Sequence, residues 1–170
     1  MKRHYLSLLN KYLDLFPCVA ILGVRQCGKT TLLKMLPKQW QIFDLEKISD
    51  FQLISKDTDL FFRLNPSYTA IDESQLLPEL FPSLRVAIDN DRNQTGRYVI
   101  TGSSSPELIK NITESLAGRI AIIELAPFSL SEAYETPLSS FYSFILSKEK
   151  PDDFRQYLNP QVDISKVHDY

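Results

Sequence analysis

The sequence predicts an α/β domain built on a mostly parallel β-sheet with helices on both faces. Short apolar runs alternate along the chain with segments of helical periodicity, which is typical of this class. The composition, 44% apolar and 24% charged over 170 residues, fits one ordinary globular domain. No apolar run approaches the roughly 20 residues that a membrane-crossing helix needs. We therefore expect no membrane partner.

Five apolar runs are expected as strands, and helical segments are expected between them. The strands are predicted at residues 18–22, 40–45, 68–71, 97–101 and 120–125. The helices are predicted at residues 3–16, 29–36, 46–65, 79–90 and 105–118. Pro17 ends the first helix, and Ser105 followed by Pro106 is a typical helix start.

Cysteine content and charge limit the function classes. Cys18 and Cys27 are too few for a disulfide framework, and the N-terminus lacks the apolar core of a signal peptide, so we expect a reduced, cytoplasmic protein. His4 and His168 have no metal-ligand spacing. The net charge of −2 argues against a general nucleic-acid binder.

The charge is unevenly distributed. Residues 1–40 hold seven Lys or Arg and one acidic residue, Asp14. We interpret this basic quarter as a solvated helix plus a phosphate site. A duplex-binding face is the alternative, and nucleic acid is otherwise unsupported as a partner.

Residues 23–30 read Gly-Val-Arg-Gln-Cys-Gly-Lys-Thr, which matches the P-loop pattern G-x-x-x-x-G-K-[ST]. The motif follows a predicted strand and precedes a predicted helix, as a P-loop requires. Glycines let backbone N–H groups wrap around phosphates. Lys29 is expected at the β- and γ-phosphates and Thr30 at Mg²⁺. The sequence therefore predicts a nucleotide site.

Asp72 and Glu73 follow the third predicted strand. A carboxylate at the end of a buried strand is suited to Mg²⁺, and we assign that role to Asp72. Glu73 is placed to polarise a water for attack on the γ-phosphate. An exposed acidic turn is the alternative for this pair, but the preceding P-loop favours the catalytic interpretation.

Thr101, Gly102 and Ser103 end the fourth predicted strand. A hydroxyl there would reach the γ-phosphate or its water, and the sequence does not choose between Thr101 and Ser103. Ligands of parallel α/β sheets bind at the carboxyl ends of the strands. Three predicted strands end in residues of this chemistry, so we expect them to share one site.

Arg119 precedes the fifth predicted strand. An arginine at that position could stabilise transition-state charge at a neighbouring subunit's nucleotide, and a surface salt bridge is the alternative. Arg92 and Arg97 are weaker candidates for the same role. Cys27 lies inside the P-loop, either as a small filler or as a reactive thiol.

Four motifs occur in the order found in a known family. They are residues 23–33 (GVRQCGKTTLL), 71–80 (IDESQLLPEL), 100–108 (ITGSSSPEL) and 115–120 (SLAGRI), continued at 124–132 (ELAPFSLSE). The chain thereby resembles, over about residues 3–135, the prokaryotic AAA-like P-loop ATPases whose members carry a further C-terminal domain.

The resemblance implies a three-layer P-loop fold with strand order 5-1-4-3-2, and ATP rather than GTP. It also makes Arg25 and Gln26 part of the loop signature. The nucleotide-binding set is then Gly23, Arg25, Gln26, Cys27, Gly28, Lys29, Thr30 and Thr31. The catalytic set is Glu73, Lys29, Thr101 and Arg119, and the Mg²⁺ set is Thr30 and Asp72.

We expect residues 1–136 to form the ATPase domain and residues 137–170 to be a tail, either the remnant or the start of a second domain. Three functions fit these residues. The first is Mg²⁺-dependent ATP binding and hydrolysis coupled to a conformational task, with self-association or a C-terminal partner domain. The second is a switch or inactive fragment that binds ATP or ADP without turnover. The third, a small-molecule kinase, lacks an arginine-rich lid.

Overall fold

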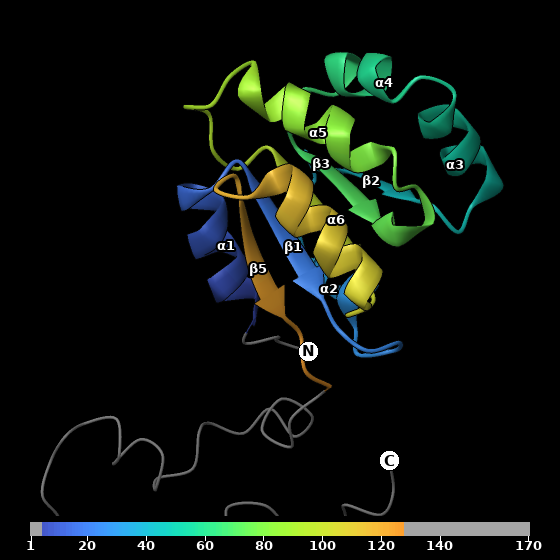
Figure 1. Cartoon of the computed structure of the whole chain (residues 1–170). Helices are drawn as coiled ribbons and strands as arrows, with labels where there is room; N and C mark the ends of the chain where they lie inside the picture. The colour runs from blue at the N-terminus through green and yellow to red at the C-terminus, as the bar shows by residue number, and fades with distance from the viewer. Residues whose placement is uncertain (1–4, 128–170) are drawn as a thin grey trace, which may run out of the picture. The chain divides into compact units, whose positions relative to one another are not determined.

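A five-stranded sheet lies at the centre of the computed structural model, which describes residues 5–127. The strands are β1 (Cys18–Leu22), β2 (Gln41–Asp44), β3 (Thr69–Asp72), β4 (Tyr98–Gly102) and β5 (Ile120–Glu124). Their order across the sheet is β2-β3-β4-β1-β5, and every neighbouring pair is parallel (Figure 1). This confirms the expected fold and the strand order that the family resemblance implied.

Helices cover both faces of the sheet and make two separate cores. They are α1 (Tyr5–Leu15), α2 (Lys29–Leu33), α3 (Ile48–Ser55), α4 (Thr58–Leu64), the 3₁₀ turn η1 (Ser74–Leu76), α5 (Leu80–Asp89) and α6 (Pro106–Leu116). Side chains of α1 and α2 pack with one face of the sheet, and those of α3 to α6 pack with the other. None of these helices has the length and apolar character to cross a bilayer.

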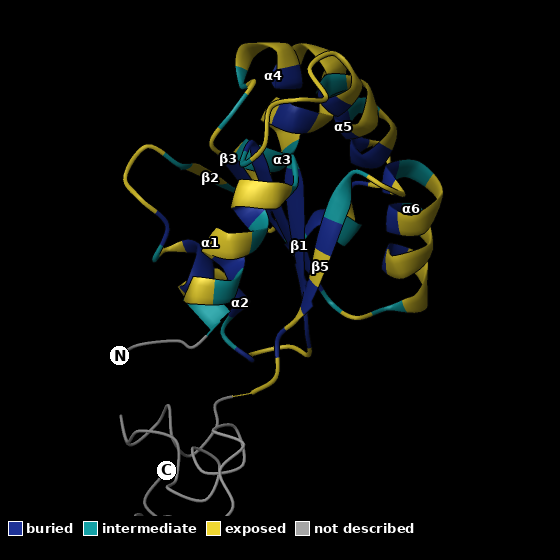
Figure 2. Cartoon of the chain, turned by 90° about the vertical axis from the view of Figure 1, so that its left-hand side faces the viewer, coloured by how far each residue is buried: buried dark blue, intermediate teal, exposed yellow. Residues whose placement is uncertain are grey.

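Strand β1 lies between the two cores and is buried along its whole length (Figure 2). Val19 and Ile21 face α1 and α2, while Cys18, Ala20 and Leu22 face the other core. A strand buried on both faces reads as a continuous apolar run, which explains why the sequence identified it. Burial also raises the pKa of the Cys18 thiol, so this cysteine is inert.

Residues 46–65 differ from expectation, because they form two helices instead of one helical segment. The side chain of Asp57 accepts a hydrogen bond from the Leu60 N–H at 2.8 Å and caps the start of α4. By contrast, the predicted start of α6 is confirmed. Ser105 caps it and accepts from the Leu108 N–H at 3.3 Å, with Pro106 as the first helical residue.

The parallel register brings the polar strand ends to one edge of the sheet. Leu22 pairs with Gly102, and Ile71 pairs with Ile100. The Gly23 N–H continues the ladder and donates to the Gly102 carbonyl at 3.2 Å. The P-loop, the end of β3 and the end of β4 therefore meet at the carboxyl edge. The predicted boundary at residue 136 and the tail at residues 137–170 lie outside the described residues.

Candidate nucleotide-binding site

The loop between β1 and α2 has a backbone that few residues tolerate. Gly28 has φ 95° and Gln26 has φ 65°, both in the left-handed region. A Cβ at Gly23 would lie 2.5 Å from the Leu125 carbonyl oxygen and 2.7 Å from Cys27 Sγ. Glycine is required at position 23 because the backbone of Leu125, just after β5, passes directly against it.

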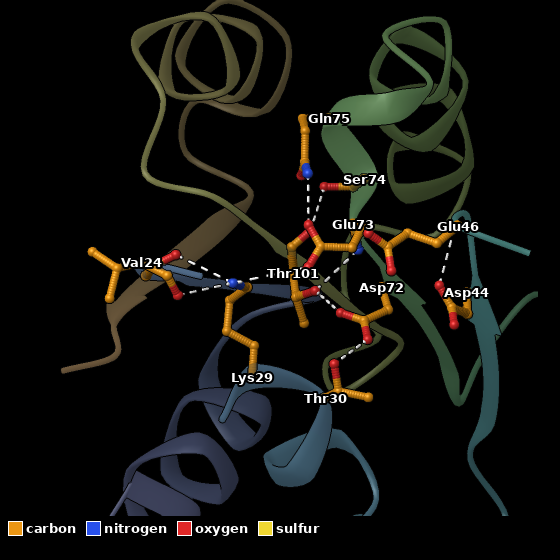
Figure 3. A network of polar contacts seen from close by, with 11 residues as sticks. Val24, Lys29, Thr30, Asp44, Glu46, Asp72, Glu73, Ser74, Gln75 and Thr101 are labelled. Carbon is orange, nitrogen blue, oxygen red and sulfur yellow. Dashed lines mark hydrogen bonds and ion pairs between the residues drawn. The ribbon is translucent and has the colours of Figure 1, made fainter. Parts of the chain in front are cut away.

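Lys29 is 5% exposed, and its ammonium group lies within the curve of this loop (Figure 3). Nζ donates to the carbonyl oxygens of Gly23 and Val24, both at 3.2 Å, and lies 3.9 Å from Glu73 Oε1. A buried charge requires partners of this kind. Two neutral carbonyls and a distant carboxylate are partners that a phosphate can replace.

Asp72 joins the loop to the two central strands. Its carboxylate is 2% exposed. Oδ2 accepts from the Thr30 hydroxyl at 2.6 Å, and Oδ1 accepts a hydrogen bond from the Thr101 hydroxyl. Figure 3 shows the three side chains meeting from α2, β3 and β4. This cluster brings together both residues predicted for Mg²⁺ and one predicted sensor.

The donors present fit Mg²⁺ in chemistry and in number. Mg²⁺ takes oxygen ligands and is commonly held by one or two protein groups, substrate phosphates and waters. The Thr30 hydroxyl and the Asp72 carboxylate are adjacent oxygen donors. Within residues 5–127 no group of three or more His, Cys, Asp or Glu gathers to hold a metal by itself. The site therefore suits a metal that arrives with a nucleotide.

Glu73 lies beside this cluster in a left-handed backbone conformation, with φ 55° and ψ 46°. Such a conformation is uncommon for a residue other than glycine. It starts the η1 turn and lets the Glu73 N–H donate to the Thr101 hydroxyl at 3.2 Å. The Glu73 side chain is about one-fifth exposed, so it lies near Lys29 with access to solvent.

Sequence reasoning missed two polar residues of the η1 turn. The Ser74 hydroxyl donates to the Thr101 carbonyl at 2.8 Å, and Gln75 Nε2 donates to Glu73 Oε2 at 2.6 Å. Both residues belong to the motif at residues 71–80, but the sequence indicated no role for them. Their closeness in sequence to Glu73 was the available signal, because a tight turn folds back onto the residue that starts it.

The remaining residues of the predicted nucleotide-binding loop differ in their exposure to solvent. Arg25, Gln26 and Thr31 are exposed, and Cys27 is buried beneath the loop against Gly23. The burial of Cys27 agrees with the filler interpretation. The sequence indicated no chemical role for Gln26. In the structure its backbone has an unusual positive φ, so this residue helps to set the conformation of the loop.

Arg119 lies at the opposite edge of the sheet from Lys29. Cys18 pairs with Ile120, which puts Arg119 at the amino end of β5. Its guanidinium donates to both Asp89 carboxylate oxygens, at 2.8 and 2.9 Å. Hydrogen bonds from Arg119, and then from Arg92, hold the pKa of Asp89 well below its usual range. In this chain Arg119 is part of a surface ion pair, and its role at a neighbouring subunit's nucleotide stays a prediction.

Arg97, another sequence candidate, is also remote from the P-loop. It is 4% exposed at the start of β4. It donates to the carbonyl oxygens of Pro66 at 2.9 Å and Asp91 at 3.2 Å, and to the Tyr98 hydroxyl at 3.0 Å. These contacts hold the loops that contain Pro66 and Asp91 together, so Arg97 has a structural role.

Comparison with known proteins agrees with this geometry. Residues 16–134 match the family model described as AAA domain. The chain is 35% identical over 133 residues to the uncharacterized proteins Mb2031c of Mycobacterium bovis and Rv2008c of Mycobacterium tuberculosis. The match covers 77% of this chain and 30% of each relative.

A solved structure with a similar fold is the Walker-type ATPase PABY2304 of Pyrococcus abyssi. Its TM-score is 0.56 at 20% identity, and the match covers 88% of this chain and 60% of that one. At this identity the likeness shows the fold alone. The family match, which spans most of the chain, shows more: this chain belongs to the AAA domain family of P-loop ATPases.

Proposed function

We propose that the chain binds ATP together with Mg²⁺ and hydrolyses it to ADP and phosphate. One observation supports this most directly. The P-loop, the end of β3 and the end of β4 bring Lys29, Thr30, Asp72, Glu73 and Thr101 into one connected set of contacts. These are the groups that phosphate binding, metal binding and water activation require.

Nucleotide binding would exchange the partners of Lys29. Its Nζ now donates to two carbonyls of its own loop. A triphosphate offers negatively charged acceptors, which attract an ammonium group more strongly than neutral carbonyl oxygens do. The ammonium group therefore has reason to leave Gly23 and Val24 for the β- and γ-phosphates, as the loop N–H groups turn toward the same anion.

Hydrolysis would follow at Glu73. This carboxylate accepts a proton from a water that attacks the γ-phosphate. The Thr101 hydroxyl meanwhile holds the Glu73 backbone in place by accepting a hydrogen bond from the Glu73 N–H. Mg²⁺, held by Thr30 and Asp72, would neutralise charge on the β- and γ-phosphates. The contacts of Thr101 support it over Ser103 as the sensing hydroxyl.

A nucleotide-operated switch without turnover is the second candidate. It is favoured by the state of Lys29, because exchanging the Gly23 and Val24 carbonyls for a phosphate reshapes the loop whether or not hydrolysis follows. The chain spans about 30% of the length of the curated relatives it matches. The conformational task that ATP serves, the C-terminal partner domain and self-association are accordingly proposals.

Two substitutions test binding and chemistry separately. Lys29→Ala removes a charged hydrogen-bond donor and is expected to weaken ATP affinity about 10- to 150-fold. Glu73→Gln keeps the size of the side chain and removes the base. It is expected to retain ATP binding and lower turnover by roughly 10²- to 10⁴-fold. Lys34→Ala, an exposed lysine just after α2, is the matched control for lost charge.

The measurements are ATP affinity by calorimetry and phosphate release with Mg²⁺, on the purified 170-residue chain. If the parent hydrolyses ATP and Glu73→Gln does not, the result supports an ATPase. Tight binding without turnover in the parent supports the switch. Turnover by Glu73→Gln at the parent rate would show that another group is the base.

A further inference from the structure

We propose that Gln75 is a positioning residue that holds the Glu73 carboxylate at the nucleotide edge of the sheet. The proposal rests on the function proposed above and assigns a role to a residue that the P-loop and the Asp-Glu pair do not account for. Its starting point is the hydrogen bond from Gln75 Nε2 to Glu73 Oε2.

This hydrogen bond is short, at 2.6 Å, and its acceptor is a carboxylate. Charge-assisted hydrogen bonds are shorter and stronger than neutral ones. Glu73 has few other restraints on its side chain. In the described part of the chain it is paired with one cation, Lys29 Nζ, at 3.9 Å from the other carboxylate oxygen.

The opposite end of the Gln75 amide is unsatisfied. Among residues 5–127, Gln75 Oε1 is the one buried side-chain polar atom without a hydrogen-bond partner. An unsatisfied buried acceptor costs about 1–3 kcal/mol, so the arrangement needs a compensating gain. The bond to Glu73 provides it, and a flipped amide would instead face the carboxylate with its own oxygen.

Strand β4 prepares the place that Gln75 occupies. A Cβ at Gly102 would meet Leu108 Cδ2 and would lie 2.5 Å from Gln75 Oε1, so glycine at this position leaves both side chains in the places they occupy. The turn is fastened to the same strand at the Thr101 hydroxyl, by the Glu73 N–H at 3.2 Å, and at the Thr101 carbonyl, by the Ser74 hydroxyl at 2.8 Å. The amide is therefore aimed by a rigid element.

The consequence appears when the nucleotide binds. Lys29 then turns to the phosphates, and Glu73 loses the attraction of that cation. Among residues 5–127, Gln75 is then the side chain that still donates to the Glu73 carboxylate. It would keep the carboxylate pointed at the attacking water, without itself contacting the reacting atoms.

A first experiment needs no nucleotide. The side-chain amide resonances of Gln75 are identified in the ¹H–¹⁵N spectrum by their loss in Gln75→Met. One amide proton is expected to lie downfield because it is hydrogen-bonded to a carboxylate, and it should move upfield in Glu73→Gln. A Gln75 amide whose resonances are the same in the parent and in Glu73→Gln overturns the proposal.

A second experiment measures ATP affinity and turnover. Gln75→Met preserves length and removes the donor. It is expected to lower kcat about 10-fold with ATP affinity within about 2-fold of the parent, which corresponds to the loss of one net hydrogen bond in the transition state. The matched control is Gln52→Met on the exposed side of α3, which should behave as the parent.

The variant Gln75→Glu tests whether the side chain at position 75 faces the Glu73 carboxylate during turnover. It places a like charge beside Glu73, which favours the protonated form of a carboxyl. The acidic limb of the kcat–pH profile should therefore move to higher pH, and a residue whose side chain does not face Glu73 would not shift it. Thermal unfolding of each variant confirms that it is folded.

The outcomes separate this proposal from the proposed function. If the parent hydrolyses ATP and Glu73→Gln does not, but Gln75→Met keeps the parent rate and Gln75→Glu keeps its pH profile, only the role of Gln75 is wrong. If the parent does not hydrolyse ATP, the hydrolytic function fails and the positioning role fails with it.

Discussion

The two edges of the sheet use buried polar groups in different ways. At the carboxyl edge, Lys29 and Asp72 are bound to loop carbonyls and to hydroxyls. At the amino edge, Arg97 is equally buried and is bound to the carbonyls of Pro66 and Asp91 and to the Tyr98 hydroxyl. Burial of a charge alone therefore does not identify a functional site in this fold.

The difference lies in what each contact holds in place. The carbonyls that Arg97 binds belong to two connecting loops, so the guanidinium holds the α4–β3 loop and the α5–β4 loop together. The groups that Lys29 and Asp72 contact lie within the phosphate loop and the ends of the central strands. A ligand with phosphates and a metal could replace each of these contacts. We therefore propose that the contacts at the amino edge serve stability, and that those at the carboxyl edge are exchanged when a nucleotide binds.

The largest effect on stability is expected from Arg97→Met. This change removes three hydrogen bonds and leaves two loop carbonyls without their partner. Truncating a buried, hydrogen-bonded charge costs roughly 2–4 kcal/mol of unfolding free energy. Urea unfolding measures this loss, with Arg63→Met on the exposed side of α4 as the matched control.

ATP affinity of the folded fraction should be unchanged in Arg97→Met, because its contacts lie at the edge opposite Lys29. A specific loss of affinity in a stable Arg97→Met protein would contradict the division between the two edges.

Thr101→Val tests the carboxyl edge with an intermediate effect. Valine keeps the shape and removes the hydroxyl that bonds Asp72 Oδ1 and the Glu73 N–H. Stability should fall by about 1–3 kcal/mol, because both partners are left without that contact. Turnover should fall as well, since Glu73 loses the anchor of its backbone.

Ser103→Ala is the matched control for a hydroxyl at the same strand end, where Ser103 is half-buried. It should leave phosphate release near the parent value. The opposite ranking of the two variants would make Ser103 the sensor.

The sequence predicted the parts of this site that depend on local pattern. Short apolar runs identified the strands, and the loop motif identified Lys29 and Thr30 without reference to distant residues. The parallel fold then implied that Asp72 and Thr101 would lie beside them, because the carboxyl ends of parallel strands share an edge. The direct contacts from Asp72 to both hydroxyls follow from that register.

The contacts made within turns, and those at the amino edge of the sheet, could not be predicted from the sequence. The left-handed backbone at Glu73 decides that Gln75 folds back onto it, and no apolar periodicity records such a turn. The sequence makes Arg119 a candidate trans-acting residue, because its position before a strand is visible in the sequence. Its partner Asp89 is distant along the chain, so the pairing depends on how α5 meets β5.

Asp89→Asn is expected to give the smallest effect and one that depends on pH. Arg119, and then Arg92, hold the pKa of Asp89 below its usual range in the folded chain. A carboxyl with a lowered folded pKa stabilises the fold above its unfolded value of about 3.9, and this contribution is lost as pH falls toward the folded value. The parent should therefore be more stable than Asp89→Asn at pH 7, and the difference should shrink below about pH 4.

The difference in unfolding free energy should be small at every pH, because solvent screens an exposed pair. Urea unfolding of both proteins between pH 7 and pH 3 measures it, with Asp14→Asn on the exposed side of α1 as control. A difference that grows as pH falls would mean that the ion pair is not what Asp89 contributes. A loss of ATP turnover in Asp89→Asn without a loss of stability would instead connect the amino edge to catalysis, and the Arg119 side chain that this change releases would be the first residue to test there.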